Sequence, residues 1–372
     1  MIIHFSILFI IIFTSVLYGR YFRYRKLSCI TNNQDVAEFK GSAIPWILVF
    51  GYIAILAGCR SGMNDTYVYV ESFQNASGTS YETNQILSSD IKDKAFYLFQ
   101  NVFKQYISSN YHAWFFLFSI IESLSLIYIL RRECVDFSSA CFFFFASTLY
   151  YNYFSMMRQW FAVVVLFLGS LLIKKKKPIW FFLLCIVMAQ FHSSAYLMIP
   201  VYFIVSRPAW SKIQIAFIIT FCIALIMLNP LLESLDDLLA GTTYDYVIDA
   251  MQSNSGSSAI RIFIAAVPVI LAWIYRKQIT GRMIDICVNM SIINLLLNVL
   301  ATFTSGLYVV RLSVYTSIYN VILYPYLLHL TVKGKNRQLL KFFFYLFYFL
   351  FYIYKMNYQG AFGYSSNILG NY

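Results

Sequence analysis

Four arginines stand where a long apolar run meets a polar segment, all on the same side of the predicted membrane topology. A guanidinium presents a rigid fork of N–H donors whose geometry matches two phosphate oxygens. An ammonium is a compact point charge and lacks this geometry. Since they lie at the borders of four different helices, they could converge on one anionic headgroup at the membrane surface. Alternatively, each arginine snorkels to the interface and pairs with a loop carboxylate. The four residues are Arg60, Arg158, Arg261 and Arg311.

Two further residues have side chains that could move protons. Asp65 follows Arg60 within the segment CRSGMNDTYVYVESF, and a carboxylate held near a sugar hydroxyl can act as a general base. His192 lies between two short apolar stretches and precedes two serines, a position that suits a proton shuttle. A helix cap or solvated acid explains Asp65 equally well, and a histidine satisfied within a helix bundle explains His192. We predict Asp65 as the base or acceptor-orienting group and His192 as its helper.

Tyrosines accompany these groups at helical spacing. Tyr69 follows Asp65 by four residues and could stack on a sugar face or belong to an aromatic belt at the interface. Arg311 and Tyr315 are also four residues apart, so they share one face of a helix. We expect Arg158 and Arg311 to begin helices that run inward, because a helix N-terminus reinforces phosphate binding.

The elements that position these residues are transmembrane helices. Of the 372 residues, 60% are hydrophobic and 12% are charged, whereas soluble domains average about 25% charged residues. Apolar runs recur along the whole sequence, which predicts an all-α polytopic membrane protein with about 12 transmembrane helices in a single domain, 1–372. The expected helices cover residues 2–18, 43–58, 113–130, 137–151, 157–173, 179–205 (as two short helices), 213–228, 262–275, 283–301, 312–330 and a short 342–354.

Charge asymmetry gives the orientation. The lysine block Lys174–Lys177 and the other expected inner turns hold 20 of the 28 basic residues, which places these turns in the cytoplasm. Two long loops, 59–111 and 229–259, hold 10 of the 16 acidic residues and are expected outside, the first with a helical stretch near 94–106. The net charge of +12 therefore reflects topology and contact with anionic lipid, and a nucleic-acid partner is not expected.

The sequence lacks the motifs of several common kinds of site. The seven cysteines are scattered and show no disulfide framework or metal spacing. The sequence holds no phosphate-cradling GxxxxGK[ST], no HExxH, no GxSxG and no DxD pair, which disfavours nucleotide hydrolysis, zinc chemistry and metal-dependent use of nucleotide sugars. We expect no metal and no cofactor.

Four blocks of sequence resemble the EpsG family, a Wzy-like group of bacterial polysaccharide polymerases. The blocks RSGMNDTYVY, MMRQWFAVVV, AQFHSSA and RLSVY occur in that order between about residues 48 and 325. The most specific pieces contain Arg158, Gln159 and Ala162, followed by Ala189, Phe191, His192 and Ser194. One departure is Asn64, where the family usually has Thr before the aspartate.

The resemblance implies a GT-C-like architecture and a glycosyltransferase that needs no nucleotide sugar. Such proteins join undecaprenyl-pyrophosphate-linked oligosaccharide repeats into capsule, exopolysaccharide or O-antigen on the outer side of the bacterial cytoplasmic membrane. Gln159 would then join the arginines, Tyr69 and Tyr315 in binding the pyrophosphate or the glycan. A flippase and a chain-length regulator are expected partners. The alternatives are a lipid-linked oligosaccharide flippase or transporter, and a membrane O-acyltransferase that uses His192 as base.

Overall fold

A computed structural model describes residues 2–18, 42–228, 258–304, 306–331, 337–358 and 363–370. Within these ranges the chain is helical and has no strand, apart from an isolated bridge between Gly62 and Ser365. Three of the described helices are long and apolar enough to cross a bilayer, and several shorter apolar helices accompany them: the three are α6 (Tyr111–Glu133), α8 (Met157–Lys174) and α15 (Arg282–Phe303). The prediction of an all-α membrane protein is confirmed. The count of 12 spans and the GT-C-like architecture stay predictions, and most of the predicted loop 229–259 lies outside the described residues.

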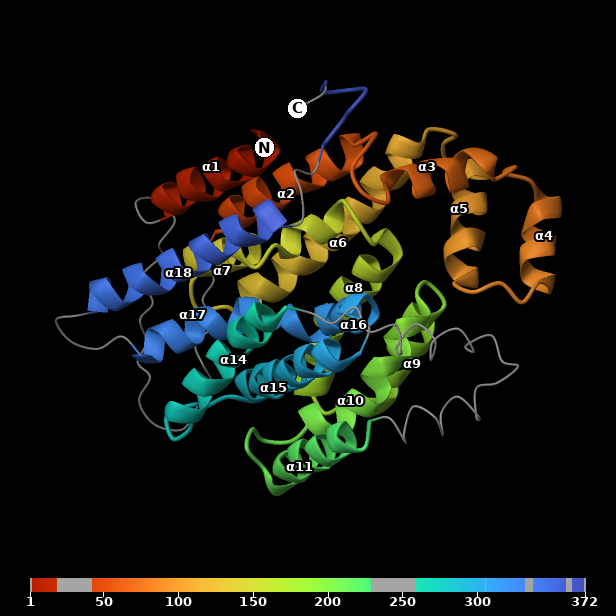
Figure 1. Ribbon diagram of the computed structural model, residues 1–372. Helices are drawn as coiled ribbons and strands as arrows, with labels where there is room; N and C mark the ends of the chain where they lie inside the picture. The colour runs from red at the N-terminus through yellow and green to blue at the C-terminus, as the bar shows by residue number, and fades with distance from the viewer. Residues whose placement is uncertain are drawn as a thin grey trace.

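The N-terminal part is organised around a close pair of helices, α2 (Ile44–Cys59) and α6. α6 turns hydrogen-bonding side chains toward carbonyl oxygens of α2. Ser119 Oγ donates to Ala54 O at 3.1 Å, and His112 Nδ1 lies 3.0 Å from Gly58 O. Such bonds satisfy polar groups in an apolar medium. α1 (Ile2–Leu17) packs against α2, and α7 (Phe137–Ala146) packs against α1 (Figure 1).

Three helices without a spanning length project from one end of the array (Figure 1). They are α3 (Thr66–Asn75), α4 (Ser80–Ser88) and α5 (Lys94–Tyr106). The predicted helical stretch at 94–106 is therefore confirmed. Asn101 on α5 fixes the turn before α4, since its amide donates to Thr79 O and accepts from Gly78 N, both at 2.8 Å.

The predicted break within 179–205 is also confirmed. α9 (Pro178–Ala189) is followed by the short 3₁₀ helix η3 (Ser193–Leu197) and by α10 (Met198–Val205). At the C-terminal end of α8, Lys174 Nζ lies 2.8 Å from Glu133 Oε2, and this ion pair joins α8 to α6. This pair marks the end of the bundle that the sequence assigns to the cytoplasm.

The C-terminal part contains the clearest departures from the expected helix boundaries. The single helix expected over 312–330 is two helices, because bonds from residue i to i−3 replace the α-helical pattern at Val321 and Ile322. The short helix expected at 342–354 is a 22-residue helix. The helices are α11 (Lys212–Ile226), α14 (Ala259–Ile274), α16 (Gly306–Ser317), α17 (Asn320–Thr331) and α18 (Arg337–Tyr358).

The helix expected over 137–151 also ends early. α7 stops at Ala146, and Thr148 adopts a left-handed φ of 62° before the 3₁₀ helix η2 (Leu149–Tyr153). A β-branched residue rarely adopts this conformation. Its hydroxyl accepts a hydrogen bond from Lys355 Nζ near the end of α18, which joins this turn to the C-terminal helix.

The described part of the C-terminus, residues 363–370, lies across the end of α2, and we call it the C-terminal strap. Ser365 N donates to Gly62 O at 2.9 Å, and Ser61 N donates to Ser365 O at 2.8 Å. Tyr364 is buried, and its hydroxyl donates to Leu56 O at 2.8 Å. The strap therefore closes the turn that contains Arg60.

The close approach of α2 and α6 gives the first prediction. A Cβ added at Gly58 would lie 2.3 Å from a ring carbon of Phe116, whereas one at Gly51 on the same helix would meet its nearest atom at 4.0 Å. We expect Gly58→Ala to destabilise the protein by about 1–3 kcal/mol, as overpacking does, and Gly51→Ala to have little effect. Melting temperatures of the purified variants in detergent measure this. Equal melting temperatures for the two variants would contradict the packing described here.

Candidate functional site

The carboxylate of Asp93 is the point where the side chains of the candidate site meet. Its Oδ2 lies 2.9 Å from Arg158 Nη1 and 3.4 Å from His192 Nδ1. Its Oδ1 accepts a hydrogen bond from Ser193 N at 3.0 Å. The Asp93 side chain is 7% exposed, whereas those of Arg158 and His192 are 27% and 28% exposed. The acid is thus enclosed, while its two partners still reach the surface.

The backbone holds Asp93 in a fixed place at the start of α5. Its φ of 57° is left-handed, a conformation that Asp adopts more readily than most residues because its short side chain bonds locally. Ala95 N donates to Gln190 O at 3.0 Å, so the start of α5 is joined directly to the turn after α9. Two segments about 100 residues apart in sequence therefore build one site.

Arg158 is the second residue of α8, as the sequence predicted. Nη1 also donates to the Tyr97 hydroxyl at 3.2 Å, and the guanidinium lies 5.6 Å and 5.7 Å from the ring centroids of Phe96 and Tyr97. A guanidinium has five N–H donors. Asp93 and Tyr97 are both met through Nη1, and the guanidinium also hydrogen-bonds the Tyr69 side chain. Donors therefore remain for the oxygens of an anionic ligand at the N-terminal end of α8, where the helix dipole favours negative charge.

The contact with Asp93 fixes the tautomer of neutral His192. A carboxylate only accepts hydrogen bonds, so the imidazole nitrogen that faces it must be the one that carries hydrogen. Nδ1–H then points at Asp93, and the lone pair of Nε2 is left for a substrate hydroxyl. The described residues offer Nε2 no hydrogen-bond partner of their own. The pair can therefore accept a proton, with Asp93 orienting the imidazole and stabilising its charged form.

Asp65 lies near this cluster, with Tyr69 between it and Arg158. Burial raises the pKa of the Tyr69 phenol, the charge of Arg158 opposes that rise, and the charge of Asp65 adds to it. Asp65 is half-buried at the start of α3, and in the described part of the chain its carboxylate accepts no hydrogen bond and forms no ion pair. Its predicted role as base stays a prediction, now beside a second acid that the sequence analysis did not single out.

Gln159 and Tyr315 line the interior side of the site. Gln159 is buried, and its amide donates to the backbone oxygen of Arg311 at 2.8 Å, which joins α8 to α16. The buried Tyr315 hydroxyl accepts from Ser194 Oγ at 3.1 Å, which joins α16 to η3. Their contacts position the helices, and binding of substrate by either residue stays a prediction.

Arg311 is exposed, and no side-chain partner is found for it among the described residues. It does not begin a helix as expected, because α16 begins at Gly306. The helix begins six residues earlier than the apolar pattern indicated, at Gly306 instead of residue 312. The argument from a helix N-terminus therefore applies to Arg158 and not to Arg311.

Arg60 is enclosed beneath the C-terminal strap and is 2% exposed. Its guanidinium lies 4.1 Å from the ring centroid of Phe115, Nη1 donates to Ala57 O, and Nη2 lies 3.8 Å from Met157 Sδ. Among the neighbouring acids, Glu122, which is buried in α6, acts most strongly on it electrostatically. In this conformation Arg60 is closed to a ligand, and its predicted contact with phosphate stays a prediction.

Arg261 belongs to a different part of the molecule. It lies in the first turn of α14, and its charge acts on Lys355 near the end of α18. The contacts found in the described part of the chain therefore do not bring the four arginines into one cluster. Arg158 lies in the cluster around Asp93. The backbone oxygen of Arg311 accepts a hydrogen bond from Gln159, the residue after Arg158. The guanidinium of Arg60 contacts Met157, the residue before Arg158.

Left-handed backbone occurs beside the site residues, as it also does at Thr148, Lys176 and Trp210 elsewhere in the described part of the chain. The three non-glycine residues with left-handed φ beside the site are Asn64 (45°) before Asp65, Asp93 (57°) itself, and Met156 (49°) two residues before Arg158. Asn tolerates this conformation better than a β-branched Thr, which accounts for the departure noted at residue 64. Strain of this kind is a recurring feature of functional sites. In the described residues, no group of three His, Cys, Asp or Glu side chains could hold a metal ion.

Helices of spanning length and a cluster of cationic and proton-accepting groups at one helix border define a helical membrane protein with a polar site at the end of its bundle. The sequence model of the EpsG family matches residues 43–367, which is most of the chain. The protein therefore belongs to the EpsG family, as the resemblance predicted, and membership supports a role of the polysaccharide-polymerase type. No curated protein and no solved structure gave a significant match.

The geometry of Asp93 gives the second prediction. Asp93→Asn keeps the shape of the side chain but removes the charge that holds His192 and Arg158. We expect polysaccharide chain extension to fall by roughly a hundredfold or more, in the range of general acid–base catalysis. Asp90→Asn is the matched control, because it removes the same charge from an exposed position three residues away. Sizing of the surface glycan from cells with each variant checks this, and equal chain lengths for both variants would contradict the assignment.

Proposed function

We propose that this protein polymerises oligosaccharide repeats carried on undecaprenyl pyrophosphate, on the outer side of the bacterial cytoplasmic membrane. A hydroxyl of the acceptor sugar attacks C1 of the donor sugar. The C1–O bond to the pyrophosphate breaks, a glycosidic C1–O bond forms, and the lipid pyrophosphate leaves. The proton of the acceptor hydroxyl passes to a base of the protein. This reaction requires neither a nucleotide sugar nor a metal ion.

The residues of the cluster divide these tasks. Arg158 holds the pyrophosphate at the N-terminus of α8 and stabilises the negative charge that grows on it. His192 accepts the acceptor's proton through Nε2, because Asp93 occupies Nδ1. Asp65 is an alternative base, and Arg311, which is exposed beside Gln159, is a further cation for the second phosphate.

One observation supports this proposal more than any other. In a member of a polysaccharide-polymerase family, Asp93 brings an anion-binding group and a proton-accepting group within 3.4 Å of a single carboxylate. A flippase needs polar groups along a path through the whole membrane. The cluster described here instead lies at one end of the bundle, where α8 begins and α9 ends.

The third prediction tests the pyrophosphate contact. One charged hydrogen bond is worth about 1.5–3 kcal/mol, so Arg158→Ala should lower turnover of the lipid-linked oligosaccharide by roughly ten- to over a hundredfold. Arg158→Lys should restore little, because an ammonium lacks the bidentate fork. Arg276→Ala is the control, since Arg276 lies at the other end of the bundle against Trp273. Purified protein in lipid vesicles is assayed for product length. Normal turnover in Arg158→Ala would remove the main support for the mechanism.

The fourth prediction tests the orientation. The charge asymmetry places Asp90 outside and Lys175 in the cytoplasm. A single cysteine introduced at residue 90 of an otherwise cysteine-free chain should react with an impermeant maleimide added to intact cells. A cysteine at residue 175 should react only after the cells are opened. The reverse pattern would place the Asp93 cluster on the cytoplasmic side and would overturn the proposed site of polymerisation.

A further inference from the structure

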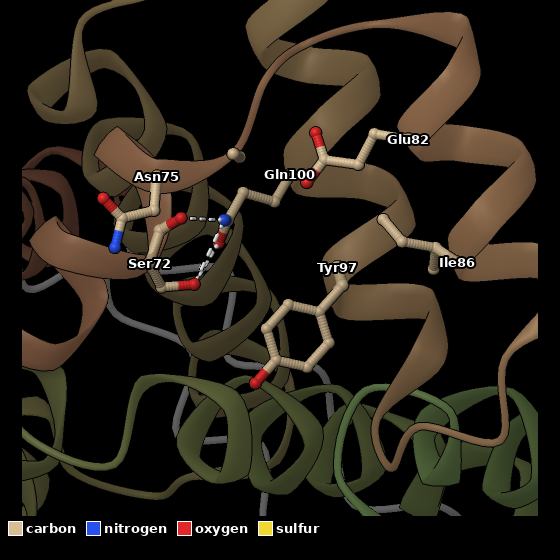
Figure 2. A pocket seen from close by; sticks show the side chains of 7 residues that line it. Ser72, Asn75, Glu82, Ile86, Tyr97 and Gln100 are labelled. Carbon is tan, nitrogen blue, oxygen red and sulfur yellow. Dashed lines mark hydrogen bonds between the residues drawn. The ribbon is translucent and has the colours of Figure 1, made fainter.

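A hollow of about 250 Å³ lies between the three projecting helices (Figure 2). Ser72 and Asn75 of α3 form one side, Glu82 and Ile86 of α4 form the other, and Tyr97 and Gln100 of α5 lie between them (Figure 2). We propose that this hollow, which we call the α3–α5 pocket, binds one neutral or amino sugar of the lipid-linked oligosaccharide, and this inference rests on the proposed function.

The pocket has the mixed character that a sugar ring requires. A sugar has hydroxyl groups around its edge and apolar C–H faces. The ring of Tyr97 and the side chain of Ile86 provide apolar surface, and Asn75, Ser72 and Glu82 provide polar groups. The Asn75 amide is exposed and has no hydrogen-bond partner in the described part of the chain. It can therefore donate to one hydroxyl and accept from another.

The internal hydrogen bonds keep the walls of the pocket in place. Gln100 Nε2 donates to Ser72 O at 2.8 Å and to Ser72 Oγ at 3.1 Å, which joins α5 to α3 (Figure 2). Glu82 Oε2 accepts from Ser77 N and Ser77 Oγ at the start of α4. The other oxygen, Oε1, has no hydrogen bond from the described residues, so it can accept from a ligand.

The charges around the pocket select against other ligands. Among the described residues, no lysine or arginine side chain lines it, and one carboxylate does. The carboxylate of Glu82 would repel a phosphate, a nucleotide or an acidic sugar at this position. Pockets that enclose a whole small molecule typically measure roughly 300–1,000 Å³, so a hollow of 250 Å³ suits a single ring of a longer chain.

Tyr97 connects this pocket to the reacting groups. Its ring lines the pocket, and its hydroxyl accepts the hydrogen bond from Arg158 at 3.2 Å. A sugar bound on the ring therefore lies one side chain away from the guanidinium that is proposed to hold the pyrophosphate. The pocket would hold a sugar of the substrate in register while a different sugar reacts.

The test uses the repeat-unit oligosaccharide, released by mild acid from the cell's lipid-linked pool, as a probe for purified full-length protein. Asn75→Ala should weaken its binding about tenfold, as the loss of one or two hydrogen bonds does. Ile86→Trp should weaken binding by filling the hollow. Asn84→Ala is the matched control, because Asn84 is an exposed amide on α4 that does not line the pocket. In turnover assays, Asn75→Ala should raise KM and leave kcat nearly unchanged.

The outcomes separate the pocket from the polymerase. Absence of probe binding by the wild type, or wild-type affinity in both Asn75→Ala and Ile86→Trp, would overturn the sugar site even if the protein polymerises. Probe binding that is lost in both variants, from a protein that never extends a chain, would support the sugar site and overturn the proposed function. Equal weakening by Asn84→Ala would show a general effect of α4 and would also overturn the site.

Discussion

The site depends on one enclosed carboxylate with three partners. The Asp93 side chain is 7% exposed and is held by a guanidinium, an imidazole and a backbone N–H. An enclosed charge is costly unless it is paired and hydrogen-bonded, so these contacts constrain the segments that supply them. α5, α8 and the junction between α9 and η3 must keep their relative positions for Asp93 to stay satisfied. The polar interaction that organises the candidate site therefore also fixes this end of the bundle.

A second enclosed charge lies at the neighbouring helix end. Arg60 is covered by the C-terminal strap and stacked on Phe115, with Met157 of α8 beside it. Burial raises the pKa of the Tyr364 hydroxyl in the strap to about 12, while the charge of Arg60 opposes the rise. Tyr364 therefore stays neutral at physiological pH and provides a cover without a charge. The residue after Met157 is Arg158, so the packing around Arg60 also supports the start of α8.

Features that depend only on the composition of one continuous stretch of chain were predicted correctly from the sequence. Apolar runs identified the main helices, and the polar AQFHSSA junction identified the break between α9 and η3. Features that depend on backbone turns were missed. The apolar pattern continues unchanged through 318–319, where α16 gives way to α17, and through Thr148, where α7 has already ended. Hydropathy does not record a change from α-helical to 3₁₀ hydrogen bonding.

Two members of the Asp93 cluster, Arg158 and His192, stood out in the sequence, and its central acid did not. Arg158 and His192 stand out because ionisable residues are rare in apolar sequence. Asp93 lies in a polar loop among other acids, where nothing local distinguishes it from Asp90. Its role arises from the contact between Ala95 and Gln190, which joins segments far apart in the chain. The burial of Arg60 has the same origin, because the residues that cover it come from the opposite end of the sequence.

The central claim, that Asp93 acts through His192, is tested most directly by a double-mutant cycle on purified protein in lipid vesicles. Turnover of the lipid-linked oligosaccharide is measured for the wild type, Asp93→Asn, His192→Ala and the double variant. Residues that act as one unit show coupling energies of about 0.5–3 kcal/mol. The account predicts that the double variant is scarcely slower than the slower single variant. Losses that simply multiply would show that the two residues act independently and would contradict the account.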